Sequence, residues 1–129
     1  MMRPQPAAAV ATFLGGCRIE ELFLPSLAVA ELRSGLARLP LGRRRSTLES
    51  DLDAVMIQGF SGRILVVDEA CAIAYATARS IRERAGRPLQ TLDALIGGMA
   101  LAHGAALATR NIADFDGYGL TVVDPWKSP

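Results

Sequence analysis

Asp93 is the acidic residue with the most unusual setting, because it stands alone in a long apolar segment. From Leu92 to Ala102 every other side chain is apolar or absent. A helix that is apolar on all sides is normally buried, and a buried carboxylate needs protons, hydrogen-bond donors or a cation. A second acid, Asp114, follows a short apolar segment at Ala106–Thr109. This pattern predicts a metal site built from carboxylates.

A third acid, Glu31, lies on a predicted helix with no charged partner one turn away. The residues three and four positions from it are Leu27, Ala28, Ser34 and Gly35. Their lack of charge weakens the interpretation of Glu31 as half of a surface ion pair. Hard carboxylate oxygens suit Mg²⁺ or Mn²⁺. Such ions can deprotonate a water and stabilise the leaving oxygen of a phosphodiester, optionally as a pair.

Each acid also has a structural interpretation. Asp93 in a first helical turn favours the helix dipole, with Thr91 as the cap. Asn111 and Asp114 have the spacing of a capping-box variant. Taken singly, each acid is more often structural than catalytic, and only their expected convergence favours chemistry. His103 is a poor general base, because it lies at the far end of its helix from Asp93, where the helix dipole favours protonated histidine.

Short apolar strands alternate with helices, which predicts a parallel sheet covered on both faces. The expected strands are Glu21–Leu24, Arg63–Val67, Ala106–Thr109 and Leu120–Val123. The expected helices are Pro6–Leu14, Leu27–Leu39 with Ser26 as its cap, an amphipathic helix after Gly42, a helix capped by Asp68 that ends near Gly86, and the apolar helix introduced by Thr91. This order places Glu31, Asp93 and Asp114 at the carboxyl edge of the sheet, where α/β proteins bind ligands.

Composition predicts a single domain over residues 1–129. Half of the residues are hydrophobic and the formal net charge is +1, so the chain has a core and no strong global field for nucleic acid. All fourteen basic residues except Lys127 are arginine. Arg43–Arg45 is interpreted as a solvated helix start, with contact to RNA phosphates as the alternative. Cys17 and Cys71 form no motif and are interpreted as free thiols in a reducing cytoplasm.

Several segments together resemble the PIN-domain ribonucleases, most closely the toxins of VapBC-type toxin–antitoxin pairs and their FitB-like branch. The resemblance covers nearly the whole chain, and its motifs are specific in combination although each is weak alone. The matching segments are M-R-P-Q-P at Met2–Pro6, V-A-E-L-R-S-G at Val29–Gly35, G-R-I-L-V-V-D at Gly62–Asp68, L-D-A-L-I-G-G-M-A at Leu92–Ala100, T-R-N-I-A-D-F at Thr109–Phe115 and D-P-W at Asp124–Trp126.

The resemblance implies a three-layer PIN-like α/β fold and a Mg²⁺- or Mn²⁺-dependent endoribonuclease toxin. Glu31, Asp93 and Asp114 would hold the metal, while Asn111 and Thr109 would orient water or ligands. An activated water would attack phosphorus without a covalent enzyme intermediate. The resemblance also implies an RNA substrate, a cognate VapB-like antitoxin and a homodimer. The cytoplasmic location is expected from the free thiols, and no membrane is expected because no apolar run is long enough to span one.

The family's first central strand, which ends in an Asp-Thr-Asn run, has no counterpart in this sequence. We therefore expect a gap in the sheet, one metal ligand fewer, and weak cleavage and lower stability for residues 1–129. The start is either truncated or degenerate. The alternative function is a degenerate PIN-like module that binds antitoxin without cleaving RNA. An unrelated phosphatase-like enzyme is disfavoured, because no glycine-rich phosphate loop is present.

Overall fold

The computed structural model describes residues 16–125 and Lys127. Contacts divide the chain into two compact units. Of the described residues, one unit comprises 16–18 with 67–125 and 127, and it is called the α4–α5 unit after its helices α4 (Glu69–Arg84) and α5 (Thr91–Ala102). The other comprises Ile19–Val66 and is called the α2–α3 unit after α2 (Ser26–Ala37) and α3 (Arg43–Gly59). The predicted helix Pro6–Leu14 and the expected gap at the first strand fall at the start of the chain, outside the described residues, and stay predictions.

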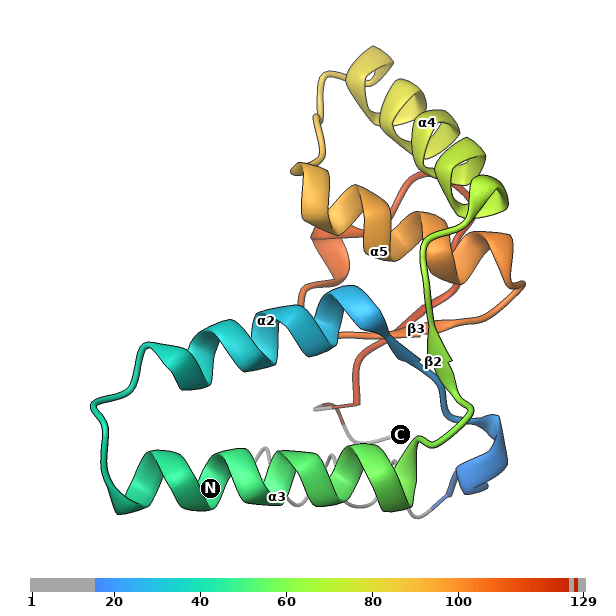
Figure 1. Ribbon diagram of the computed structural model, residues 1–129. Coiled ribbons are helices and arrows are strands. Elements are labelled where there is room, and N and C mark those ends of the chain that lie inside the picture. Colours follow the sequence, from blue (N-terminus) through green and yellow to red (C-terminus); the bar gives the residue numbers. More distant parts are fainter. Residues whose placement is uncertain (1–15, 126, 128–129) are drawn as a thin grey trace, which may run out of the picture. The chain divides into compact units, whose positions relative to one another are not determined.

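The α2–α3 unit is a helical hairpin attached to one pair of strands (Figure 1). Its elements are η1 (Ile19–Glu21), β1 (Leu24–Pro25), α2 (Ser26–Ala37), α3 (Arg43–Gly59) and β2 (Ile64–Leu65). Strands β1 and β2 are parallel, with Leu24 opposite Ile64. The predicted cap at Ser26 was wrong. Extended Pro25 holds the cap position without a side-chain bond, because β1 runs directly into the helix.

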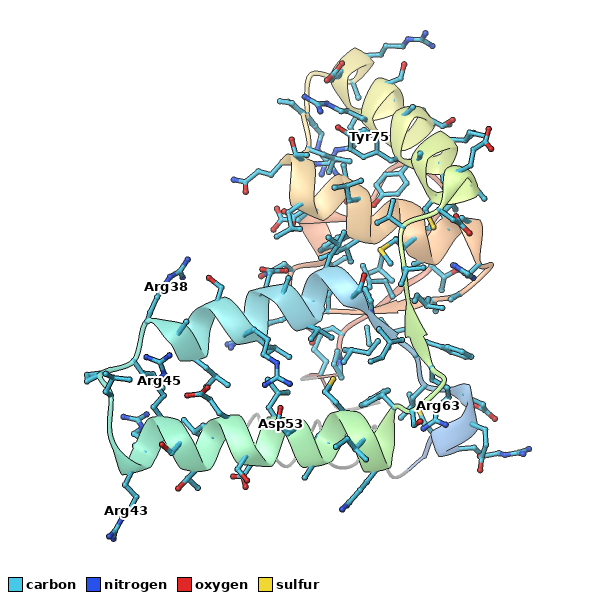
Figure 2. The ribbon with its side chains drawn as sticks, in the orientation of Figure 1. Arg38, Arg43, Arg45, Asp53, Arg63 and Tyr75 are labelled. Atoms are coloured by element: carbon cyan, nitrogen blue, oxygen red, sulfur yellow. The ribbon has the colours of Figure 1, made fainter. Side chains whose placement is uncertain are left out.

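Helices α2 and α3 are held together mainly at their surfaces. Neither helix contains a buried residue. Arg33 on α2 forms an ion pair with Asp53 on α3, at 2.6 Å between Nη2 and Oδ1. Within α3, Arg45 donates to Glu49, while Arg43 extends away from the hairpin (Figure 2). The solvated interpretation of the arginine cluster therefore fits Arg43 better than Arg45.

The α4–α5 unit contains two packed helices and a second pair of strands (Figure 1). Its elements are α4 (Glu69–Arg84), α5 (Thr91–Ala102), β3 (Leu107–Ala108), η2 (Ile112–Asp114) and β4 (Val122–Val123). Strands β3 and β4 are parallel, with Leu107 opposite Val122. The predicted Asp68 cap is confirmed by its bond from the Cys71 backbone. The Thr91 cap was wrong, since extended Gln90 holds that position without a side-chain bond.

The apolar helix α5 is buried, as the sequence predicted, and it packs against α4. Its buried residues include Ala94, Ile96 and Met99, and Met99 is completely buried. A Cβ atom added at Gly98 would lie only 2.8 Å from the backbone nitrogen of Tyr75 on α4. Glycine at this position therefore lets the two helix backbones approach closely, and the core of this unit forms around that contact.

The strands of both units are parallel, as predicted, but they are shorter than the sequence suggested. Only Ile64–Leu65 of the expected strand at 63–67 forms strand ladder, and only Leu107–Ala108 of the expected strand at 106–109. Strand assignment requires a paired ladder, which an apolar run alone does not provide. No helix in the described part of the chain has the length and apolar character needed to cross a membrane.

Candidate functional site

Glu31 lies on α2 and is exposed. It borders a hollow of about 430 Å³ between α2 and α3. The other residues that line this hollow are mostly leucines: Leu32, Gly35, Leu36, Leu48 and Leu52. Within its own unit, Glu31 is therefore a single carboxylate at the rim of an apolar depression. The other predicted acids belong to the α4–α5 unit, so the meeting of all three stays a prediction.

Asp93 occupies the first turn of α5 and is half-buried. Its negative charge acts on the nearby phenol of Tyr118. Burial raises the pKa of Tyr118, the positive charge of Arg82 opposes this rise, and the charge of Asp93 adds to it. The Tyr118 hydroxyl is buried and has no hydrogen-bond partner among the described residues. Asp93 therefore acts on a buried polar group that no hydrogen bond from the described residues satisfies.

Two aromatic residues pack onto α5 at Gly97, one helical turn after Asp93. The Tyr118 hydroxyl occupies the space that a Cβ atom at Gly97 would fill, and the Phe115 ring would lie 3.5 Å from that atom. Residues four positions apart share a helix face. The packing therefore brings the segment that carries Asp114 onto the same side of α5 as Asp93.

Asp114 is the last residue of η2 and is exposed. Its backbone nitrogen donates to the carbonyl of Asn111 at 3.0 Å, but the Asn111 side chain makes no capping bond. The capping-box alternative is therefore not supported. The Thr109 hydroxyl accepts the Asn111 backbone N–H at 3.1 Å, which shapes the entry to this turn.

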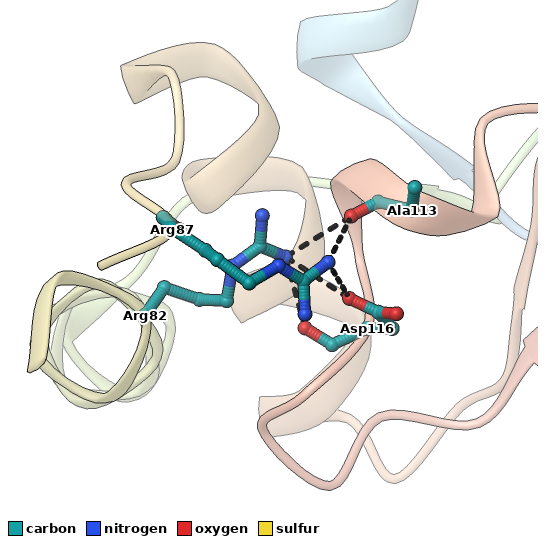
Figure 3. Close-up of polar contacts among 4 residues, drawn as sticks. All are labelled: Arg82, Arg87, Ala113 and Asp116. Atoms are coloured by element: carbon teal, nitrogen blue, oxygen red, sulfur yellow. Dashed lines mark hydrogen bonds and ion pairs between the residues drawn. The ribbon is translucent and has the colours of Figure 1, made fainter. Parts of the chain in front are cut away.

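An arginine pair holds the segment around Asp114, and the sequence reasoning missed it (Figure 3). Arg82 on α4 is only 6% exposed. Its Nη1 atom donates to the carbonyl oxygens of Ala113 at 3.2 Å and Asp116 at 2.9 Å. Arg87 donates from Nη2 to the Asp116 carboxylate at 2.7 Å. These bonds flank Asp114 on both sides and fix the backbone that carries it.

One feature of the sequence could have predicted the close packing of Tyr118 and α4 on α5. Adjacent glycines inside a helix, here Gly97 and Gly98, cost helix stability and usually mark a close approach of another group. Each does so, Gly97 against Tyr118 and Gly98 against α4. Nothing comparable marks Arg82, because a single arginine on an amphipathic helix is ordinary. His103 ends α5 as predicted, at the opposite end from Asp93.

The PIN-domain family model matches residues 2–118. The chain belongs to the PIN-domain family. This PIN domain is 36% identical to the plasmid stability protein StbB of Pseudomonas syringae pv. tomato, over 98% of the chain and 91% of the relative. It is 32% identical to the VapC ribonuclease Y4jK of Sinorhizobium fredii, over 98% and 91%. It is 34% identical to the toxin FitB of Neisseria gonorrhoeae, over 97% and 90%.

Solved structures give the same result. The structure of FitAB bound to an IR36 DNA fragment matches this PIN domain with a TM-score of 0.90 at 32% identity, over 98% of the chain and 89% of its counterpart. These likenesses confirm the predicted α/β fold class and the resemblance to VapC and FitB toxins. The PIN family model also spans both compact units.

Proposed function

We propose that this PIN domain is a metal-dependent endoribonuclease, the toxin of a type II toxin–antitoxin pair. Relatives named as a VapC ribonuclease and as the toxin FitB align with nearly the whole chain. The observation that carries the proposal furthest is the packing of Phe115 and Tyr118 on Gly97. That packing gathers Asp93 and the segment around Asp114 on one side of α5, within one unit.

The proposed metal ligands are Glu31, Asp93 and Asp114, directly or through water. Their donor atoms are all carboxylate oxygens, which fit Mg²⁺ or Mn²⁺ rather than a softer metal. When bound, the divalent ion supplies an activated water and stabilises the leaving oxygen of the phosphodiester. We assign Asn111 and Thr109 to orienting water or ligands, since the Thr109 hydroxyl already holds the Asn111 backbone.

We propose that the arginine pair supports the acids by holding the segment that carries Asp114. Arg82 and Arg87 hold the backbone at Ala113 and Asp116. Fixing both sides of Asp114 limits the positions that its carboxylate can take, and a preformed ligand set binds a cation without paying to order the loop. We therefore assign these arginines as positioning residues rather than catalytic ones.

The test is cleavage of a mixed RNA pool with Mg²⁺ or Mn²⁺ added. Asp93→Asn, Asp114→Asn and Glu31→Gln should each lower the rate by more than about a hundredfold, since loss of outer-shell partners alone costs up to that much. Asp51→Asn provides the matched control, because Asp51 is an exposed acid on α3. Cleavage by all three variants at the wild-type rate would remove these acids from the site.

RNA cleavage, together with antitoxin binding and growth arrest, separates the ribonuclease toxin from the alternative function of a binding module without activity. A chain that cleaves no RNA with either ion, but still binds its cognate antitoxin, is the degenerate binding module. A chain that arrests growth when expressed, and is rescued by the antitoxin, is the toxin. We also propose a homodimer in the cytoplasm.

We propose that an apolar segment of the antitoxin occupies the hollow between α2 and α3. The hollow is lined mainly by leucines, and a solved FitAB assembly contains a chain similar to this one. Leu32→Glu should weaken antitoxin binding, because Leu32 lines the hollow. Leu41→Glu is the matched control, since Leu41 is 87% exposed and lies outside the lining. If Leu32→Glu splits a homodimer and leaves antitoxin binding intact, a second copy occupies the hollow instead.

A further inference from the structure

We propose that Asp68, Cys71 and His103 form a zinc site at the junction of α4 and α5. Each residue offers one donor atom: a carboxylate oxygen, the thiol Sγ and an imidazole nitrogen. These three atoms lie within 4.8 Å of one another. All three residues belong to the α4–α5 unit, so the cluster does not depend on the other half of the chain.

The scaffold holds two of the donors in defined places. Asp68 caps α4, and its Oδ1 atom accepts the Cys71 backbone N–H at 2.9 Å, which fixes the carboxylate beside the thiol. Cys71 is completely buried. A Cβ atom at Gly98 would lie 3.2 Å from the Cys71 carbonyl oxygen, so α5 packs tightly against this turn of α4. His103 stands at the end of that same helix α5.

The donor set points to zinc rather than magnesium. One sulfur, one nitrogen and one oxygen suit tetrahedral Zn²⁺, with a water in the fourth position. Zinc–ligand distances of about 2.0–2.3 Å require the donors to draw somewhat closer together. His103 is exposed at the end of α5, so its side chain has room to make that adjustment.

Binding replaces one proton with one metal ion. Burial raises the pKa of the Cys71 thiol. When Zn²⁺ binds, the S–H bond breaks, the sulfur electron pair forms the Zn–S bond, and the proton leaves to solvent. No oxidant or reductant takes part.

This cluster is distinct from the proposed nuclease site. His103 and Asp93 lie at opposite ends of α5, and ten residues at 1.5 Å each separate them by about 15 Å. The nuclease acids offer only hard oxygens, whereas this cluster includes sulfur. A simpler interpretation is an attraction between Asp68 and His103, since the charge of His103 helps to lower the pKa of Asp68 after the larger effect of its hydrogen bonds from Cys71.

Cobalt binding to the complete chain separates these interpretations. Co²⁺ alone serves as the probe, because a thiolate ligand gives Co²⁺ an intense charge-transfer absorption that carboxylates do not. We expect one equivalent of Co²⁺ to produce this band and Zn²⁺ to abolish it by displacement. Cys71→Ser should remove the band, and Cys17→Ser, the other free cysteine, should retain it. Asp93→Asn should also retain it, because that variant touches only the nuclease site.

Two further variants keep the test independent of folding. His103→Gln removes the only histidine of the chain at an exposed position. Asp68→Asn removes a charge while keeping an equally good helix cap. Each should weaken Co²⁺ binding by more than about tenfold, the least that even outer-shell losses cost. The proposal is overturned if the wild-type chain gives no thiolate band, if Cys17→Ser loses the band, or if both exposed variants bind Co²⁺ as tightly as the wild type.

Discussion

Helices α4 and α5 pack through buried residues, whereas α2 and α3 contain no buried residue. Cys71, Ala78 and Arg82 of α4 are buried, as is much of α5. Neither α2 nor α3 buries a single residue, and an apolar hollow lies between them. The two helix pairs of this chain therefore differ in how completely their contact surfaces are buried.

Residue size accounts for the difference. Glycine and alanine on α5 let its backbone approach α4, and close approach excludes water from the groups between the helices. Larger side chains line the space between α2 and α3, and the lining residues Leu32 and Leu48 are 49% and 36% exposed. The first pair therefore suits the task of holding charged groups in fixed positions. The second fits the proposed role of the α2–α3 hollow in binding the antitoxin.

The largest expected effect is on the free energy of unfolding. It separates the buried Arg82 of α4 from the exposed Arg33 of α2. Arg82→Ala should destabilise the protein by about 3 kcal/mol, because it removes a buried guanidinium that donates hydrogen bonds to the carbonyl oxygens of Ala113 and Asp116. Arg33→Ala removes an exposed ion pair with Asp53 and should cost at most about 1 kcal/mol. Urea denaturation of both variants measures the difference.

Arg82→Lys sharpens the same comparison. Lysine keeps the charge but cannot reproduce the fork in which Nε donates to the Arg87 carbonyl while Nη1 donates to the carbonyls of Ala113 and Asp116. We expect this variant to fold with a smaller loss of stability than Arg82→Ala. Its RNA cleavage rate should still fall, because Arg82 no longer holds the backbone on both sides of Asp114. Equal losses of stability in Arg82→Ala and Arg33→Ala would show that the two helix pairs are not different in kind.

The next effect concerns a glycine in each helix pair. Gly98→Ala should destabilise the protein by roughly 1–3 kcal/mol, because the added Cβ would meet backbone atoms of Tyr75 and Cys71. Gly35→Ala on α2 should stabilise it by up to about 1 kcal/mol, since nothing lies within 4 Å of the added atom and alanine favours helix. Thermal unfolding of the two variants should shift in opposite directions, and shifts in the same direction would contradict the contrast.

The smallest effect comes from helix capping, which also differs between the pairs. Asp68 caps α4 with its side chain, whereas α2 and α3 have no such bond. Hydrogen bonds from Cys71 hold the pKa of Asp68 below its ordinary value. The folded pKa is therefore lower than the unfolded one, so this contribution is present above about pH 4 and is lost as the pH falls through the folded pKa.

Asp68→Asn tests this contribution without removing the cap. Asparagine caps a helix about as well as aspartate but does not titrate. With EDTA present, both proteins should have similar denaturation midpoints at pH 7, and the wild type should lose more stability at pH 3. If both proteins decline equally on acidification, Asp68 gains nothing from its charged form.

The order and type of the main elements were readable from the sequence alone. The apolar run after Thr91 predicted a buried helix, Asp68 predicted a cap, and short apolar segments predicted parallel strands. These features follow from local patterns, because burial on all sides, capping and strand formation each leave a signature within a few residues. The motifs that resembled PIN-domain toxins were local in the same sense.

Tertiary packing alone decided which distant side chains meet. Arg82 reaches Asp116 across 34 positions, and His103 lies beside Asp68 across 35 positions of the sequence. The shortness of the strands and the loss of the expected caps at Ser26 and Thr91 also depended on neighbouring segments. Contacts of this kind arise from how α4 and α5 close on one another around Gly98, and no periodicity within either helix encodes that meeting.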